Sequence, residues 1–542
     1  MNVIHVTNSA ARGMYDGKLF TGEELRAVTG CLRDESRREG QAEAVAFPRS
    51  LNDVSSLLKL AAERHWSVTV SGARTGITAG AVPNGGLVIC LERMNRFSGL
   101  RRGEDGTLLL TCEAGVTLAD IRHAVATGVF ADSAQWRDEE KKLAKTLASG
   151  RWSFPPDPTE TSASIGGMAA CNASGAHTFS YGQTRSYIES ARVVLADGNL
   201  LNLRRGQARA DETGALILRY PDGHERRLQT PGYAQPRTKN AAGYFSGDHL
   251  DALDLFIGSE GTLGVIAAVE IRLVPRAETC SAQVVFWENE GKALAFVRQL
   301  RDEKQALGVE AIEYFDSHAL AFLRRRREVL GAASAVPACL PTGAGCGVYV
   351  DLGVDKEALL SVLRRLSDII ARLGGRLEDT WSAHTANERE KLRMFRHALP
   401  ESVNAFIAEQ RKKYPDLTKL GTDMAVPDEH LETIMRLYHR TLSQAGLTYV
   451  IFGHIGDNHV HVNILPATPE EYAAGKKVYM NLARAVVAMG GSPAAEHGVG
   501  KLKRDLLALL FGEEGIRQMR AIKAVFDPDS RLSPGNLFTV IP

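Results

Sequence analysis

The chain has 542 residues, a length that exceeds one hydrophobic core of usual size and predicts two or three domains. Its 65 basic and 64 acidic residues nearly cancel, which argues against a nucleic-acid partner, and no apolar run reaches the ~20 residues that span a bilayer. Seven cysteines without a Cys-x-x-Cys pair indicate neither a disulfide framework nor an iron–sulfur cluster, and the N-terminus lacks the pattern of a secretory signal. These features favour a cytoplasmic protein.

Residues 1–40 are charged and irregular, and we interpret them as an N-terminal lead-in. The pattern then predicts a strand at 45–48, a helix at 51–64 and a strand at 68–70. That second strand runs into the small-residue loop 71–80, where the backbone could approach a phosphate and donate N–H groups to it. By itself the loop supports an ordinary turn equally well.

A second small-residue tract covers residues 155–175, and it reads either as a flexible linker or as a wall against a flat ligand. The apolar side chains of Ile165, Met168 and Phe179 argue against a linker. A third tract, 239–244, precedes the block 255–266, which we interpret as two apolar strands separated by glycines.

The second half of the chain alternates strand and helix patterns. The expected elements are strands at 282–287, 309–314 and 347–352, and helices at 293–301, from 317, at 356–373 and at 470–489. We expect one sheet covered by helices on one face, closing over a ligand held by the first half. The arginine run 324–327 interrupts this pattern, and a solvated surface is favoured for it over membrane or partner contact.

Two stretches near the C-terminus carry candidate metal ligands. The strand 447–452 turns through Gly456-Asp457-Asn458 into a second strand at 460–465, so that His454 and His461 flank one turn. Together with Glu496 they form a three-ligand set that suits zinc and leaves a position open for substrate. His497 follows directly and would stand beside the cation. Taken alone, the first stretch could also be only a polar hairpin.

Five segments closely resemble the FAD-linked 2-hydroxyacid dehydrogenases of the vanillyl-alcohol-oxidase (PCMH-type) flavoprotein superfamily. These segments are 71–83, 155–175, 256–264, 453–463 and 495–500, and the likeness runs from about residue 44 to residue 538. The resemblance implies an α+β fold with a PCMH-type FAD-binding domain at 41–276 and a ferredoxin-like (βαβ) cap with the substrate and metal sites at 277–495. A C-terminal helical segment, 496–542, would return to the FAD domain.

The resemblance also implies the roles of individual residues. Non-covalently bound FAD would contact Ser71, Gly72, Ala73, Arg74, Thr75, Gly76, Thr78, Pro156, Asp157, Ser164, Gly166, Gly167, Asn172, Gly175, Gly261, Val265 and Asn536. His177 and Cys171 are the nearest exceptions to non-covalent binding. The family more often has consecutive glycines where this chain has Ala73-Arg74, so Arg74 either pairs with the pyrophosphate or alters the loop.

The remaining roles concern the substrate side. Arg396 and Lys419 would bind the substrate carboxylate, and His497 would contact the substrate and act as the base. His454, His461 and Glu496 would bind a divalent metal, for which zinc is favoured and manganese or iron are alternatives.

The activity implied is metal-assisted oxidation of a D-2-hydroxy acid, such as lactate or 2-hydroxyglutarate, to the 2-oxo acid, with hydride passing to flavin N5. Electrons would leave to a quinone or an electron-transfer flavoprotein. A homodimer and peripheral attachment to the inner membrane are left open. Two alternatives remain, a flavin-free zinc hydrolase and an alkylglycerone-phosphate-synthase-like transferase. That transferase group carries consecutive histidines where this chain has Ala495-Glu496-His497.

Overall fold

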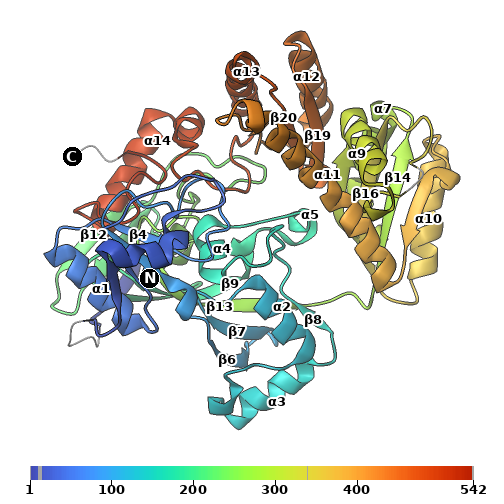
Figure 1. Cartoon of the computed structure of the whole chain (residues 1–542). Coiled ribbons are helices and arrows are strands. Elements are labelled where there is room, and N and C mark those ends of the chain that lie inside the picture. Colours follow the sequence, from blue (N-terminus) through green and yellow to red (C-terminus); the bar gives the residue numbers. More distant parts are fainter. Residues whose placement is uncertain (1, 10–14, 338–339, 540–542) are drawn as a thin grey trace.

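The computed structural model describes residues 2–9, 15–337 and 340–539, which form three β-sheets with helices packed around them (Figure 1). Strands from the chain up to Pro275 build two of the sheets, and strands between Thr279 and Ile464 build the third. The colours of Figure 1 separate these parts, from blue and green to yellow and orange. This mixed architecture agrees with the predicted α+β class, while the domain boundaries at 41, 277 and 496 stay predictions.

The smallest sheet contains the predicted β-α-β start. Its strands follow the order β2 (Leu19–Thr21), β3 (Ala44–Ala46), β5 (Leu87–Cys90) and β4 (Val68–Ser71), and the last three run parallel. Helix α1 (Leu51–Glu63) begins where the Ser50 hydroxyl accepts the amide of Asp53, and it buries Leu57 and Leu58 in the same core as the strands. Strand β4 ends at the loop predicted to approach a phosphate.

The largest sheet of the described residues has nine strands. Its order is β12 (Glu225–Gln229), β11 (Ala215–Arg219), β1 (Val3–Thr7), β10 (Leu200–Arg204), β9 (Ile188–Val194), β13 (Val265–Pro275), β7 (Leu108–Glu113) and β6 (Phe97–Arg102), with β8 (Trp152–Ser153) paired to β13. The helices of this part are α2 (Leu118–Thr127), α3 (Asp138–Leu147), α4 (Ile165–Cys171), α5 (Thr178–Tyr181) and α6 (Ala252–Phe256).

The C-terminal helix α14 (Arg504–Phe526) packs back onto this first part of the chain, as Figure 1 shows in red. The rings of Phe256 and Phe526 lie 5.1 Å apart, and Met519 joins the same core. Helix α14 therefore packs on the first part of the chain, while the extent of a returning C-terminal segment stays a prediction.

Two sequence interpretations are wrong here. The N-terminus is no irregular lead-in, because β1 pairs with β10 and β11 and buries Ile4 and Val6, whose period-two spacing fits one face of a strand. The apolar run at 255–257 is no strand either, because α6 occupies Ala252–Phe256. The Asp251 side chain accepts the Leu253 amide at its start, so a capped helical turn forms before the glycines.

The third sheet has seven strands, and part of it has the topology predicted for the cap. Strands β17 (Thr380–Ala383), β14 (Thr279–Trp287), β16 (Cys346–Val354) and β15 (Val309–Phe315) are neighbours in that order, which is the antiparallel arrangement of a ferredoxin-like β-α-β-β-α-β unit. Strands β19 (Tyr449–His454), β20 (His459–Ile464) and β18 (Leu420–Gly421) extend it beyond β15. The turn between β19 and β20 is a short 3-10 helix, Ile455–Asp457.

Helices cover both faces of this sheet, so the expectation of one covered face is wrong. One face packs on α7 (Glu290–Asp302), α8 (Lys304–Leu307), α10 (Leu359–Arg372), α12 (Leu431–Gln444) and α13 (Pro469–Ala488), and the other on α9 (Ser317–Leu330) and α11 (Ala386–Lys413). Neighbouring residues of β14 alternate between the two cores: Val285 joins one and Val284 the other. The arginine run lies within α9, where Arg324 and Arg327 donate to backbone carbonyls and Arg326 pairs with Glu401.

The short helix α5 joins the first part of the chain to the seven-stranded sheet. The Tyr181 hydroxyl donates to Glu310 at 2.6 Å, and the Ser180 hydroxyl donates to the Val309 carbonyl at 2.5 Å. Lys304 donates to the Phe179 carbonyl at 2.6 Å. These contacts fix strand β15, which carries part of the candidate site, against the small-residue tract.

Candidate active site

The three predicted metal ligands lie close together. His454 ends β19, His461 lies in β20, and Nε2 of each faces the Glu496 carboxylate, at 3.4 Å for His454 and 3.3 Å for His461. The side chains are 6%, 15% and 7% exposed for His454, His461 and Glu496, so the cluster is shielded from water. Their spacing suits one small cation, and their role as ligands stays a prediction.

Glu313 of β15 joins this cluster to Arg396. One carboxylate oxygen lies 2.5 Å from Nδ1 of His454, and the other accepts Nε–H of Arg396 at 3.0 Å. Burial disfavours the charged carboxylate, but Arg396 and His454 outweigh this effect and lower the pKa of Glu313 to about 2. Glu313 therefore orients both a predicted metal ligand and a predicted substrate arginine.

His497 lies beside the cluster and contacts two carboxylates. Its Nδ1 is 3.4 Å from Asp423 and its Nε2 is 3.3 Å from Glu496. Burial opposes protonation of the ring, but Asp423 and then Glu496 raise the pKa of His497 to about 9. A cation bound to Glu496 would lower this pKa, because its charge repels the imidazolium.

The turn that follows His497 is held by residues from both parts of the chain. The backbone amides of Val499 and Gly500 each donate to the Glu260 carboxylate at 2.7 Å. On the other side, the amides of Glu496 and His497 donate to Asp423, which also accepts from Nζ of Lys503 at 2.6 Å. The position of the predicted base is therefore fixed by two carboxylates that the sequence interpretation did not assign.

Lys239 is a buried cation that reaches the same carboxylate as His454, His461 and His497. Its Nζ lies 2.6 Å from Oε2 of Glu496 and 3.1 Å from the Gly175 carbonyl, and its side chain is 1% exposed. Burial disfavours the charged forms of both partners, but their attraction outweighs it, so the pKa of Lys239 is raised and that of Glu496 is held well below its usual range.

Sequence reasoning also missed a third imidazole. His459 starts β20 directly opposite His454 and lies two residues before His461, so period-two alternation places all three on one face of the sheet. The side-chain donors of His454, His459, His461 and Glu496 all lie within 4.8 Å of one another. Burial, above all, lowers the pKa of His459 to about 3, which keeps the ring neutral. The alternation of this strand was the signal that could have revealed it.

Lys419 is not joined to the other predicted substrate residues. It precedes β18 and is half-buried, and no hydrogen bond or ion pair to it is found within residues 2–9, 15–337 and 340–539. Burial and then Arg37 lower its pKa. Its contact with a substrate carboxylate stays a prediction.

The predicted flavin tracts converge. The Ala73 amide donates to the Ser164 hydroxyl at 3.3 Å, and the amides of Gly258 and Glu260 donate to carbonyls at 169 and 170. A Cβ at Gly72 would lie 2.4 Å from the Ser164 hydroxyl, so a larger residue at this position would displace that hydroxyl. Asn536 of the tail donates to the carbonyls of Gly80 and Glu260, which ties the loop after β4 to the block 255–266.

Several predicted flavin residues are engaged within the protein. Asp157 accepts the His177 amide, and Asn172 bonds Arg185 and Gln183, so both hold their tract in shape. A Cβ at Gly175 would lie 2.0 Å from the Asp157 carbonyl. Val265 lies fully buried in the core beneath β4. Flavin contact of the whole predicted set stays a prediction; its other members are Ser71, Thr75, Gly76, Thr78, Pro156, Gly166, Gly167 and Gly261.

Arg74 turns back onto its own loop. It has a positive φ of 61°, and its Nη1 donates to the Gly72 carbonyl at 3.0 Å and contacts the Cys90 sulfur at 3.1 Å. Its Nη2 pairs with Glu92 at 3.1 Å. Of the two roles left open for Arg74, these contacts favour shaping of the loop over pairing with a pyrophosphate.

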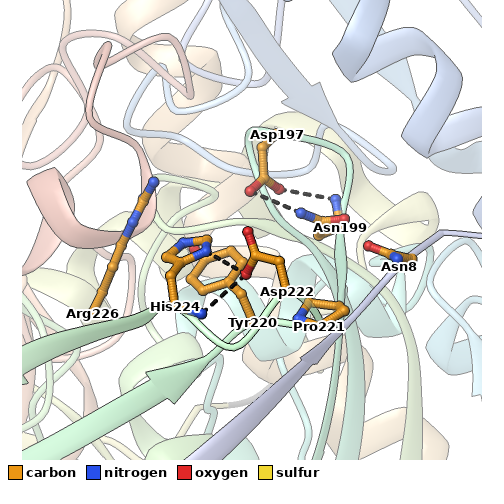
Figure 2. A pocket seen from close by; sticks show the side chains of 8 residues that line it. All are labelled: Asn8, Asp197, Asn199, Tyr220, Pro221, Asp222, His224 and Arg226. Atoms are coloured by element: carbon orange, nitrogen blue, oxygen red, sulfur yellow. Dashed lines mark hydrogen bonds and ion pairs between the residues drawn. The ribbon is translucent and has the colours of Figure 1, made fainter.

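A separate surface hollow lies at the edge of the nine-stranded sheet (Figure 2). Its polar side chains pair with one another: Asp197 accepts from Asn199, and Asp222 contacts His224 at 2.6 Å. The hollow shares no residue with the histidine cluster, so we assign it no part in the chemistry.

Comparison with known families identifies the class of this protein. A profile described as "FAD binding domain" matches residues 42–136 and 140–204, and one described as "FAD linked oxidases, C-terminal domain" matches residues 277–537. The chain belongs to the FAD-linked oxidases and is a flavin-dependent oxidoreductase. The resemblance found in the sequence is confirmed, and family membership argues against a flavin-free hydrolase.

Relatives match over almost the whole chain. A D-lactate dehydrogenase of Anaerostipes hadrus is 27% identical over 96% of this chain and 94% of its own length. A D-2-hydroxyglutarate dehydrogenase of Stutzerimonas stutzeri is 28% identical over 91% of this chain and 90% of its own. The glycolate oxidase subunit GlcD of Bacillus subtilis is 25% identical over 92% and 90%.

Solved structures show the same fold at low identity. A p-cresol methylhydroxylase with bound substrate has a TM-score of 0.64 and 14% identity, covering 96% of this chain and 94% of its own. An alkyldihydroxyacetonephosphate synthase has a TM-score of 0.59 and 14% identity, covering 97% and 83%. The PCMH-type FAD-binding fold is therefore shown. In the part of the chain that the structure describes, every helix is too short or too polar for a transmembrane segment.

Proposed function

We propose that this protein oxidises a 2-hydroxy acid of the D-lactate or D-2-hydroxyglutarate type to the 2-oxo acid. The observation that carries the proposal is one continuous set of contacts: Arg396 to Glu313, Glu313 to His454, and His454 through Glu496 to His497. This set provides a cation for a carboxylate, a site for a divalent metal and a base. The names of the relatives support the substrate class.

The residues present fit both groups that this chemistry needs. The small-residue tracts converge, as close approach of the backbone to a dinucleotide requires, and imidazoles grouped with a buried carboxylate suit zinc, manganese or iron. FAD supplies the hydride acceptor and the cation supplies Lewis acidity toward the hydroxyl oxygen. Binding of FAD is proposed to be non-covalent, since both His177 nitrogens face carboxylates and burial raises the pKa of Cys171 to about 12.

The protein's own residues position the substrate and accept its proton. The terminal nitrogens of Arg396 make no hydrogen bond within the described residues, so they are free to grip a carboxylate bidentately, while Lys419 adds a point charge. Asp423 faces Nδ1 of His497, which leaves Nε2 to take the hydroxyl proton as hydride leaves the adjacent carbon. The two electrons then pass to an external acceptor, a quinone or an electron-transfer flavoprotein.

The decisive experiment is anaerobic mixing of the purified yellow protein with the D and L forms of lactate and 2-hydroxyglutarate, and with glycolate. Bleaching of the flavin band by a D-2-hydroxy acid, with one equivalent of 2-oxo acid formed per flavin, is the expected result. Absence of bleaching by all of these acids would refute the proposal.

A further inference from the structure

His459 is the least exposed polar side chain of the histidine cluster, and it has no satisfied partner. Its side chain is 0% exposed, yet neither ring nitrogen has a hydrogen-bond partner within the described residues. Its Nδ1 faces Oε2 of Glu496 at 3.7 Å, and its Nε2 is 3.0 Å from Oδ1 of Asp423 but off the line of a hydrogen bond. A buried nitrogen lone pair without a donor is costly unless a cation or another donor meets it.

All three imidazoles of the cluster have the same arrangement. One nitrogen of each ring faces Glu496, and the other faces an outer acceptor. These acceptors are the Glu313 carboxylate for His454 at 2.5 Å, the Thr422 carbonyl for His461 at 3.2 Å and the Asp423 carboxylate for His459 at 3.0 Å. Histidines that bind metals typically present their second nitrogen to such an acceptor, which fixes the ring and the tautomer. His459 therefore has the same arrangement of inner and outer partners as the two predicted ligands, although its distance to Glu496 is longer and its contact with Asp423 lacks hydrogen-bond geometry.

We propose that His459 is a ligand of the same cation, so that this chain offers three imidazoles and one carboxylate to the metal. The inference rests on the metal-assisted function proposed above and goes beyond it, because it changes the number of protein ligands. We leave His497 outside the set because its side chain is 30% exposed and its Nδ1 faces Asp423; with Asp423 and Glu496 it forms a second group of donors within 4.8 Å of one another.

A fourth protein ligand restricts the identity of the metal. A tetrahedral ion with four protein ligands has no open position, as in structural zinc sites. A 2-hydroxy acid that binds through its hydroxyl and one carboxylate oxygen needs two positions. Iron(II), manganese(II) or cobalt(II), which accept six ligands, satisfy both requirements, so the proposal favours such an ion over four-coordinate zinc.

The test uses the flavin-loaded full-length protein, stripped of metal by a chelator and reloaded with cobalt(II). X-ray absorption of the parent protein counts bound imidazoles without any substitution, and three are expected. His459→Asn should keep its flavin and show two bound imidazoles. Its cobalt affinity should fall by at least about 10–100-fold, because removing even a residue that only hydrogen-bonds a metal ligand weakens metal binding by this factor. His439→Asn, a change at a histidine that bonds Glu290 and Tyr449 away from the cluster, is the matched control and should bind as the parent does.

The outcomes separate this inference from the proposed function. A count of only two imidazoles in the parent would overturn His459 as a ligand and leave the metal site intact. The same holds if His459→Asn binds cobalt within about threefold of the parent affinity, because even the loss of an outer partner of a ligand should cost more than this. Loss of cobalt affinity in His454→Asn as well as His459→Asn supports the four-ligand set. If the parent binds no cobalt in the chelator-treated, flavin-loaded state, both the metal role and this inference are wrong.

Discussion

Replacing Glu313 with glutamine tests whether one buried carboxylate aligns the metal site and the substrate arginine together. In the parent, one oxygen accepts from Arg396 at 3.0 Å and the other lies 2.5 Å from Nδ1 of His454. Glutamine has nearly the same shape but only one acceptor oxygen. Its NH₂ group must therefore face either the guanidinium or the imidazole N–H, so one of the two contacts becomes donor against donor.

The size of the effect follows from burial. Glu313 is 3% exposed and His454 6%, whereas Arg396 is 22% exposed and keeps some access to water. Removing one partner of a buried ion pair costs about 3–5 kcal/mol, and the partial exposure of Arg396 places the expected loss near the lower end. Loss of the outer partner of a metal-binding histidine should weaken metal binding by about 10–100-fold.

Metal titration of the chelator-treated protein and denaturant unfolding measure these two effects separately. Glu310→Gln is the matched control, because Glu310 lies on the same strand but bonds Tyr181 and not the cluster. We expect Glu313→Gln to lose metal affinity and to raise KM for the hydroxy acid, while Glu310→Gln changes stability alone. Equal metal affinities in the two variants would refute the role of Glu313.

Three further predictions follow from the same geometry. His497→Asn should keep flavin and metal but slow anaerobic flavin reduction by about 10²–10⁴-fold, the usual contribution of a general base, and a rate within about threefold of the parent would remove it from the mechanism. Acid precipitation should release yellow flavin into the supernatant, whereas a coloured pellet would mean a covalent link. Burial opposes protonation of His177, but Asp157 and Asp351 raise its pKa to about 9. The protonated ring therefore contributes fully to the free energy of unfolding below the unfolded-state pKa of about 6.5, and this contribution is lost as pH rises through about 9. Between about pH 6.5 and 9, the unfolding temperature of Asp351→Asn should therefore change less with pH than that of the parent protein. The same pH dependence in both proteins would contradict the prediction.

Local patterns predicted most of the second half of the chain. Alternating or periodic apolar residues located β14, β15, β16, α7 and α10 within a few residues, because each helix buries one face, and each strand both faces, in cores formed mainly by neighbouring elements. The same reasoning failed at the N-terminus. Strand β1 is stabilised by β10 and β11, about 200 residues away, and the charged residues that follow β1 concealed its short alternation.

The sequence indicated part of the candidate site, but it did not single out His459, which lies between two residues that were assigned. His454, His461 and Glu496 stand in recognisable motifs, so the sequence alone indicated a cluster there. Glu313 and Asp423 were missed, because a carboxylate in a strand or loop has the sequence signature of any surface acid. Only the pairing of β15 with β19 brings Glu313 to His454.

The proposed base, the candidate metal site and the predicted flavin loop share contacts with both parts of the chain, so a displacement of one of them would displace the others. Thr78 of the loop accepts the Lys501 amide, and its hydroxyl donates to the His497 carbonyl at 3.4 Å. Lys239 of the third tract holds Glu496, and Glu260 holds the turn after His497. Hydride transfer and proton transfer from one substrate need reacting atoms within about 3–3.5 Å of their acceptors. Supports that cross from the flavin loops to the cluster meet this requirement, because a shift of either part moves both acceptors together.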